Sequence, residues 1–309
     1  MKENPVDFRR DHRSVKVGLV QMSCSEQREA NFAKAEKWVA ECARHGAAMV
    51  CLQELSFDPY FCQSEDHARF ERAESREGSI ATFAKQLARR FQLVLAVGLF
   101  ERRAPGIYHN SFLLFEQDGS LVGTYRKAHV PDDPSYYEKF YFTPGEQPFP
   151  AFETSIGKVG ICICWDQWFP EAARLTALSG AEILFFPTAI GWLPEDRENF
   201  GESQLSAWQT MMRSHAIANG LFVVAPNRTG TEQGIEFWGN SFICDPYGNV
   251  LQSLPAAEEG ILVQDLDLSL CETARIHWPF LRDRRTDLYA DLTTRWRADH
   301  PISNRFSTE

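Results

Sequence analysis

Short apolar runs alternate with amphipathic stripes along most of the chain. Runs that are apolar at nearly every position predict buried strands at residues 15–22, 47–52, 93–100, 159–164, 183–186 and 221–225. Between them, apolar residues at helical spacing predict helices, and one such face is formed by Phe32, Ala35, Val39 and Cys42. This alternation is typical of an α/β fold whose parallel strands are covered on both faces.

Capping and breaking residues indicate where the helices begin and end. Ser23 and Glu26 form the pattern of a capping box ahead of the first helix. Pro170 suits the first turn of another helix. A longer helix is expected over residues 201–219. Residues 108–125 have the pattern of a β-hairpin, with two apolar arms around an Asp-Gly turn.

The length and composition favour one large folded unit with a short appendage. The 309 residues are 44% hydrophobic and 24% charged, which is close to the average for folded domains. We expect residues 1–270 to form one domain. The charged tail, residues 271–309, has few apolar positions of its own, so we expect it to pack at a subunit interface.

The net charge and the cysteine positions indicate which partners and which cellular compartment to expect. A net charge of −10 disfavours nucleic acid and anionic membranes and is compatible with a cationic small molecule. The polar N-terminus lacks the apolar core of a signal peptide, and no run approaches 18 apolar residues, so we expect a cytoplasmic protein. The eight cysteines lie mostly in apolar stretches, which indicates reduced thiols.

Three reactive side chains come just after predicted strands or hairpin arms. Glu54 follows the second run, Lys127 follows the hairpin and Cys164 ends the run at 159–164. Open α/β sheets bind their ligands at the carboxyl ends of the strands. Each residue alone has an ordinary interpretation, as a surface carboxylate, a solvated lysine or a buried thiol.

The sequences around these three residues resemble the nitrilase superfamily, whose members use a Glu–Lys–Cys triad. The similar segments are residues 52–55, 125–131 and 163–171, and the resemblance extends from Val15 to about Asp267. Residues 138–145 and 164–174 look most like the N-carbamoylputrescine amidases. The resemblance implies a four-layer αββα sandwich and homo-oligomers, and it requires no metal or cofactor.

The implied chemistry asks for these residue types. An amide or ureido carbon is a poor electrophile, so the nucleophile is expected to be the thiolate of Cys164, with Glu54 taking its proton. Lys127 and the backbone amide of Trp165 can stabilise the oxyanion. The resemblance adds Glu138 as a second glutamate that places the lysine. The expected reaction cleaves an N-carbamoyl amine through a Cys164 thioester to an amine, ammonia and carbon dioxide.

The expected substrate is N-carbamoylputrescine, although one position departs from the family pattern. Relatives that act on N-carbamoyl amino acids carry an arginine where this chain has Gln167 and Trp168, which argues against an acidic substrate unless Arg228 serves instead. The putrescine-type relatives usually place an acid where this chain has Leu193. A buried ammonium needs a counter-charge, and Glu195 and Asp196 are the candidates in this sequence. Matching family motifs assign Tyr60, His129 and Ala189 to substrate binding as well.

Other functions stay open at this point. The triad leaves another amide, a nitrile or an N-carbamoyl amino acid as alternative substrates, and an interaction scaffold without activity is the non-enzymatic alternative. A metal site is disfavoured, because Cys162 and Cys164 are expected to point to opposite faces. No glycine-rich phosphate loop lies between a strand and a helix.

Overall fold

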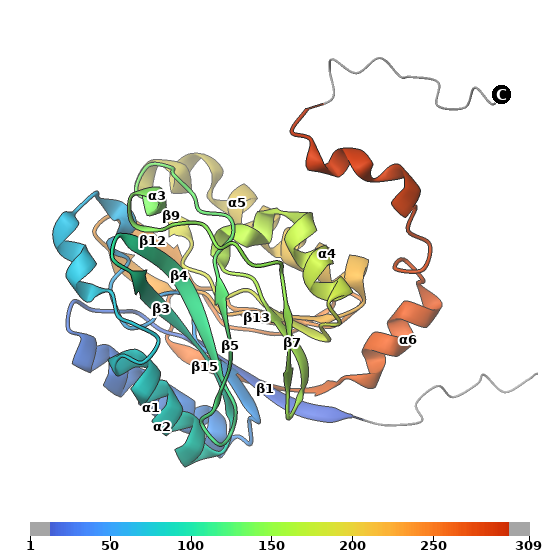
Figure 1. Ribbon diagram of the computed structural model, residues 1–309, viewed down its shortest axis with the longest axis horizontal. Coiled ribbons are helices and arrows are strands. Elements are labelled where there is room, and N and C mark those ends of the chain that lie inside the picture. The colour runs from blue at the N-terminus through green and yellow to red at the C-terminus, as the bar shows by residue number, and fades with distance from the viewer. Residues whose placement is uncertain (1–12, 297–309) are drawn as a thin grey trace, which may run out of the picture.

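Two six-stranded sheets form the centre of the molecule. The structure is a computed structural model that describes residues 13–296. Along the first sheet the strands are β15 (Gly260–Asp267), β1 (Ser14–Gln21), β2 (Met49–Cys51), β3 (Val94–Ala104), β4 (Ile107–Phe115) and β5 (Leu121–Arg126). Strands β1, β2 and β3 are parallel, while β15, β4 and β5 pair antiparallel to their neighbours (Figure 1).

The second sheet has the same design, with a parallel centre and antiparallel edges. Its strands in order are β14 (Val250–Ser253), β13 (Phe242–Cys244), β10 (Phe222–Ala225), β8 (Ile183–Phe185), β7 (Gly157–Ile161) and β6 (Ala151–Thr154). Strands β7, β8 and β10 are parallel. A small third sheet contains β11 (Thr229–Glu232), β12 (Ile235–Trp238) and β9 (Gly191–Trp192).

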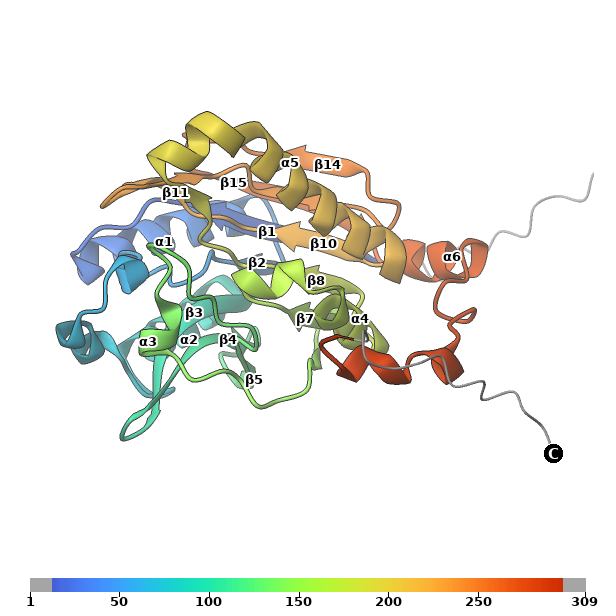
Figure 2. The same ribbon diagram turned by 90° about the horizontal axis from the view of Figure 1, so that it is seen from above.

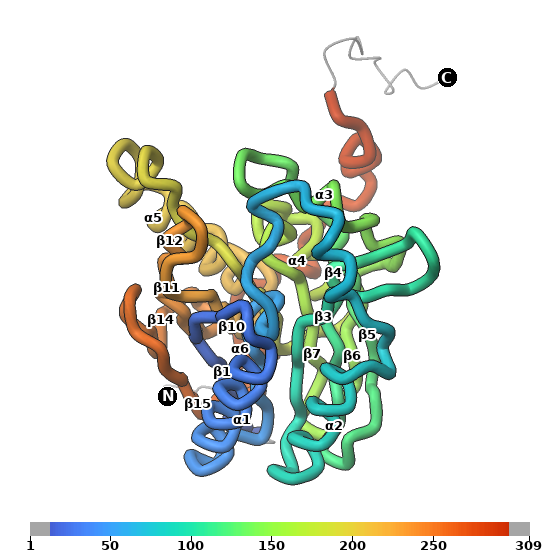
Figure 3. The backbone as a smooth tube through the Cα atoms, turned by 90° about the vertical axis from the view of Figure 1, so that its left-hand side faces the viewer, coloured from blue at the N-terminus to red at the C-terminus, as the bar shows by residue number. Residues whose placement is uncertain are grey.

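Helices cover the outer face of each large sheet. Helices α1 (Arg28–Arg44) and α2 (Ser79–Phe91) pack on the first sheet, and α4 (Pro170–Leu178) and α5 (Pro194–Asn219) pack on the second (Figures 2 and 3). The remaining helices are short: α3 (Glu138–Tyr141), α6 (Ser269–His277), η1 (Phe61–Gln63), η2 (His67–Arg72), η3 (Cys164–Trp168), η4 (Thr286–Leu288) and η5 (Ala290–Thr293).

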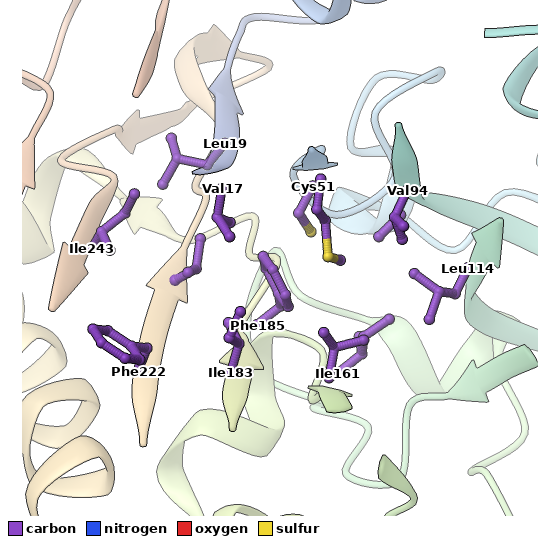
Figure 4. Packing of buried hydrophobic residues seen from close by; sticks show 14 of the residues in the cluster. Val17, Leu19, Cys51, Val94, Leu114, Ile161, Ile183, Phe185, Phe222 and Ile243 are labelled. Carbon is purple, nitrogen blue, oxygen red and sulfur yellow. The ribbon is translucent and has the colours of Figure 1, made fainter. Parts of the chain in front are cut away.

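The two sheets face each other across a continuous apolar core. Val17, Cys51 and Val94 from the first sheet pack toward Ile161 and Phe185 from the second (Figure 4). Alternate residues of the same strands point outward and pack under the helices. Burial on both faces explains the continuous apolar runs within these strands. The predicted four-layer αββα sandwich is confirmed.

Two local predictions are wrong. Gln27 is the N-cap of α1 and makes no side-chain cap, because Ser23 and Glu26 bond elsewhere. The Ser23 hydroxyl pairs with Glu259, and the Glu26 carboxylate forms ion pairs with two arginines of η2. These charge-assisted bonds are stronger than a neutral cap bond. Helix α5 begins at Pro194, seven residues before the predicted start, because proline fits its first turn.

The C-terminal segment, residues 271–296 of the described chain, begins inside helix α6. The expected boundary between residues 270 and 271 falls inside α6, whose Cys271 is buried against the core between the sheets. Beyond α6 the described chain leaves the sheets and passes α4, with Leu292 and Trp296 largely exposed (Figures 1 and 2). Its role at a subunit interface stays a prediction. Within residues 13–296, no helix is both long and apolar enough to cross a membrane.

Candidate active site

Glu54 lies three residues beyond β2, in a segment held tightly against the first sheet. Its side chain is fully buried. A Cβ atom on Gly98 of β3 would lie 2.8 Å from the nitrogen of Leu55, so only glycine lets the segment approach this closely. From the far side, Nη2 of Arg228 donates to the backbone oxygens of Glu54 at 3.2 Å and of Leu55 at 2.8 Å. Glu54 is thus held by its backbone as well as by its side chain.

Lys127 lies directly after β5, and its fully buried ammonium bridges two carboxylates. Nζ donates to Oε1 of Glu54 at 2.9 Å and to the two oxygens of Glu138 at 2.9 and 2.7 Å. Gly145 fixes the backbone here, because its N–H donates to the oxygen of Lys127 at 2.8 Å. Burial opposes the charge, but Glu138 and Glu54 outweigh it and raise the pKa of Lys127 well above its usual value.

Glu138 is the first residue of α3 and is fully buried. Besides Lys127, it accepts a hydrogen bond of 2.7 Å from the hydroxyl of Tyr60. Burial raises the pKa of Glu138 to about 7, and the nearby Glu54 adds to the rise while Lys127 opposes it. Glu138 and Glu54 therefore share one ammonium.

One oxygen of Glu54 is left available. Oε1 accepts from Lys127 and, at 2.6 Å, from Nδ2 of Asn110. Oε2 is buried and has no hydrogen-bond partner among the described residues. An unsatisfied buried carboxylate oxygen is costly and readily accepts a proton from a neighbouring group.

Cys164 lies at the turn between β7 and η3, in a backbone conformation that favours glycine. Its φ is +43°, which places it in the left-handed region. The carboxylate of Asp166 holds the turn, accepting from the N–H of Ile163 at 2.9 Å and from the hydroxyl of Tyr125 at 2.7 Å. The N–H of Cys164 donates to the oxygen of Pro187 at 2.9 Å. The strain is therefore maintained by contacts from two other segments.

The thiol of Cys164 is neutral in the resting site. Burial raises its pKa well above the ordinary value, and Glu54 adds to the rise. Lys127 and a hydrogen bond from the backbone of Ala189 oppose it. The raised pKa therefore favours the protonated thiol. Cys162 packs into the cluster under α4 and α5, whereas Cys164 contacts the core between the sheets. Alternation alone would place two residues with this spacing on one face, but β7 ends at Ile161 and the left-handed turn at Cys164 reverses its direction.

A cavity of about 660 Å³ leads to Cys164. Its walls carry the rings of Tyr136, Trp165, Trp168 and Trp238, and three acids, Asp133, Glu195 and Asp196. No lysine, arginine or histidine is among its described lining residues. Glu54, Lys127 and Glu138 are fully buried behind the thiol. Aromatic faces and carboxylates together suit a positively charged ligand.

The structure brings some of the predicted substrate-binding residues to this cavity. Trp165, Trp168, Glu195 and Asp196 line it, as does Leu193. Trp165 is also in the first turn of η3, where backbone N–H groups have no partner within the helix. These placements are compatible with the predicted roles, which stay predictions.

The other predicted residues lie outside the lining. The Gln167 side chain is fully buried and accepts from Nε1 of Trp208 at 2.8 Å, so it supports the wall from behind. Nδ1 of His129 lies 2.7 Å from Oδ1 of Asp166, and the ring stacks on Phe169. Tyr60 reaches Glu138 instead of the cavity, and Ala189 contacts Cys164 through its backbone.

Several supporting residues were not predicted from the sequence, and one alternative residue is unsuited to the role considered for it. Asn110, Asp166 and Asp133 were not predicted, although Asp166 lies within the motif around the nucleophile. Arg228, the alternative carboxylate binder, is fully buried, and its guanidinium is committed to Glu232 and to backbone oxygens of residues 54–58. It therefore cannot serve a carboxylate in the cavity.

Comparisons with known proteins agree with this geometry. A family model described as carbon-nitrogen hydrolase matches residues 16–276. The N-carbamoylputrescine amidase of Arabidopsis thaliana is 42% identical over 292 residues, which cover 91% of this chain and 96% of the relative. The citrullinase of Francisella tularensis is 38% identical over 288 residues, covering 92% of this chain and 99% of the relative.

A solved structure shows the same architecture. The carbon-nitrogen hydrolase from Helicobacter pylori G27 has a TM-score of 0.89 to this chain at 44% identity, covering 92% of this chain and all of that one. The similarity extends over both sheets and their helices. The two folds are therefore the same along nearly their whole length.

Proposed function

The chain belongs to the carbon-nitrogen hydrolases of the nitrilase superfamily, and from this premise we propose that it hydrolyses N-carbamoylputrescine. The observation that carries the proposal is the cavity that leads to Cys164. Three carboxylates and four aromatic rings line it, and its described lining contains no basic residue. The terminal ammonium of this substrate would be attracted to such walls.

The first half of the reaction forms a thioester. The sulfur of Cys164 attacks the ureido carbon as its proton passes to the available Oε2 of Glu54. The oxyanion of the tetrahedral intermediate is stabilised by Nζ of Lys127 and the N–H of Trp165. Glu54 then returns the proton to the leaving nitrogen, and ammonia departs. An N-alkylcarbamoyl thioester remains on Cys164.

The second half regenerates the thiol. Glu54 takes a proton from water as the water attacks the thioester carbon, and the same donors stabilise the new oxyanion. The C–S bond breaks, the thiol regains its proton and a carbamic acid is released. It decomposes to putrescine and carbon dioxide. Lys127 keeps its charge throughout, because two buried carboxylates raise its pKa.

Citrulline is the second candidate, favoured by the similarity to the Francisella citrullinase. Citrulline is N-carbamoylputrescine with one added carboxylate on the carbon that bears the amine. That carboxylate would enter a cavity lined by acids, with no described basic residue to pair with it. Unpaired like charges in a partly buried site are unfavourable, so the cavity favours the substrate without the carboxylate.

The two substrates form a matched pair for the test. Ammonia release should give a higher kcat/KM for N-carbamoylputrescine than for citrulline, and higher also than for N-carbamoyl-β-alanine. A higher kcat/KM for citrulline would identify citrulline, the second candidate, as the preferred substrate. Equal kcat/KM values for all three substrates, or turnover of none, would contradict the proposed substrate. Only the assignment to the carbon-nitrogen hydrolases would then remain.

A further inference from the structure

The cavity wall is apolar at the start of α5. Leu193 is the N-cap of α5 and lines the cavity that leads to Cys164. Leucine cannot pair with the distal ammonium of a substrate. If a cation binds here, another residue of the same cavity must supply the counter-charge.

Glu195 and Asp196 are less suited to that role than their position suggests. Both lie in the first turn of α5, where the unpaired N–H groups carry a partial positive charge. Leu193 provides no side-chain cap, so these two carboxylates are the acidic groups that offset this charge. Their field at the cavity is therefore partly cancelled by their own helix.

Asp133 has no such opposing charge. It lies in the segment 131–137, outside any helix, and it lines the cavity together with Pro131, Pro134 and Tyr136. Among the described residues its carboxylate has no ion pair or hydrogen bond. An acid without a partner beside an aromatic ring is suited to an alkylammonium group.

The segment that carries Asp133 is fixed to the catalytic cluster. It begins four residues after Lys127 and leads directly into Glu138. The N–H of Tyr136 donates to the oxygen of Asp133 at 2.8 Å, and its hydroxyl lies 3.2 Å from both the nitrogen and the oxygen of Gly191. The N–H of Tyr137 donates to the oxygen of Cys62 at 2.8 Å. The position of Asp133 is therefore set relative to Glu138 and to the cavity wall at Gly191.

We infer that Asp133 is the specificity-determining residue that pairs with the distal ammonium, an inference that rests on the proposed function. The residue that recognises the charge of the substrate is then on the loop between Lys127 and Glu138, not on α5. One loop would hold both the catalytic cation and the group that selects a cationic substrate.

The test compares two substrates and two neighbouring variants. N-pentylurea has the length of N-carbamoylputrescine but ends in a methyl group instead of the ammonium. Asp133→Asn should lower kcat/KM for N-carbamoylputrescine by roughly tenfold. This is a small effect for the loss of a charge-assisted hydrogen bond, because Asp133 is exposed to solvent. Its kcat/KM for N-pentylurea should stay within about twofold.

Asp132→Asn is the matched control, because it removes the same charge from an exposed neighbour outside the cavity lining. It should leave both substrates nearly unchanged. Equal losses of kcat/KM for N-carbamoylputrescine in the two variants would show that only the long-range charge matters. That result would overturn the inference. A loss confined to Glu195→Gln or Asp196→Asn would move the assignment to α5.

A binding measurement separates this inference from the proposed function. In a Cys164→Ala background, titration calorimetry with N-carbamoylputrescine reports affinity without turnover. Weaker binding on adding Asp133→Asn, but not Asp132→Asn, would support the residue assignment even if the wild type prefers citrulline in kinetic assays. Unchanged affinity in the Asp133→Asn variant would reject the assignment while leaving the hydrolase function intact.

Discussion

Nζ of Lys127 lies 2.7 Å from Oε2 of Glu138, and neither side chain has any exposed surface. The pair shares its space with Glu54, so the buried cluster contains two carboxylates and one ammonium. Because burial raises the pKa of Glu138 to about 7, the cluster changes charge close to neutral pH. The free energy of unfolding is therefore expected to vary with pH near neutrality.

The first prediction concerns the pH dependence of stability. The folded-state pKa of Glu138 is raised above that of the unfolded chain, so its contribution to stability is fully present below about pH 4.5 and is lost as pH rises through about 7. Glu138→Gln removes this titration. Urea unfolding between pH 5 and 8 should therefore show a steeper decline for wild type than for the variant. Parallel declines would mean that Glu138 does not titrate in this range.

Cys164→Ala should abolish turnover and leave the fold intact. Alanine keeps the Cβ atom, so the backbone strain at φ +43° is unchanged. Ammonia release should fall to less than about one thousandth of wild type. Cys162→Ala is the control, because that thiol is buried two residues away on the opposite side of the strand. It should lose some stability and retain activity, and an inactive Cys162→Ala variant with an active Cys164→Ala variant would reverse the assignment.

Lys127→Met should damage the chemical step more than substrate binding. The ammonium is completely buried behind Cys164, so its charge acts chiefly on the oxyanion of the transition state. We expect kcat to fall by about a hundredfold or more with a smaller change in KM. Lys158→Met, on the exposed side of β7, should match wild type in both constants. A raised KM at normal kcat would instead make Lys127 a binding residue.

Glu54→Gln should block both thioester formation and thioester hydrolysis. Glutamine fills the same space but cannot accept the thiol proton, which the raised pKa of Cys164 keeps on the sulfur at rest. Mass spectrometry after mixing with substrate should find no acyl adduct on the peptide that contains Cys164. Accumulation of that adduct would show that Glu54 acts only in the second half of the reaction.

Arg228 should prove to be a positioning residue for Glu54. It pairs with Glu232 at 2.7 Å and donates to the backbone oxygen of Leu55, so Arg228→Met should cost about 3–5 kcal/mol by leaving a buried carboxylate unpaired. Adding Glu232→Gln should recover part of that stability, as measured by urea unfolding. It should not recover kcat, because the segment carrying Glu54 has lost its anchor. Full recovery of kcat in the double variant would assign Arg228 a purely structural role.

The sequence was sufficient to predict the elements that position the triad. Strand β2 is buried at every position and β7 at every position except Lys158, so their composition distinguishes them from loops. The half-polar edge strand β15 and the short strands β9, β11 and β12 carry no comparable pattern and were not predicted. Weak alternation in a short strand cannot be told from a loop.

The supporting contacts of the site could not be predicted for a different reason. Asn110 reaches Glu54 across 56 positions of the chain, and Arg228 reaches Leu55 across 173. Such pairs depend on strand register and on how two sheets stack, which local composition does not specify. The cavity position of Asp133 likewise depends on the path of a loop whose own sequence carries only turn signals.

The site is assembled across the boundary between the two sheets. Glu54 and Lys127 follow strands of the first sheet, whereas Cys164 follows a strand of the second. A slide of one sheet over the other by the width of a side chain would leave every hydrogen bond within each sheet intact and yet separate the thiol from its base. The catalytic rate should therefore be more sensitive to the alignment of the two sheets than the secondary structure is. On warming, turnover should be lost while the far-ultraviolet circular dichroism signal is still that of the native protein.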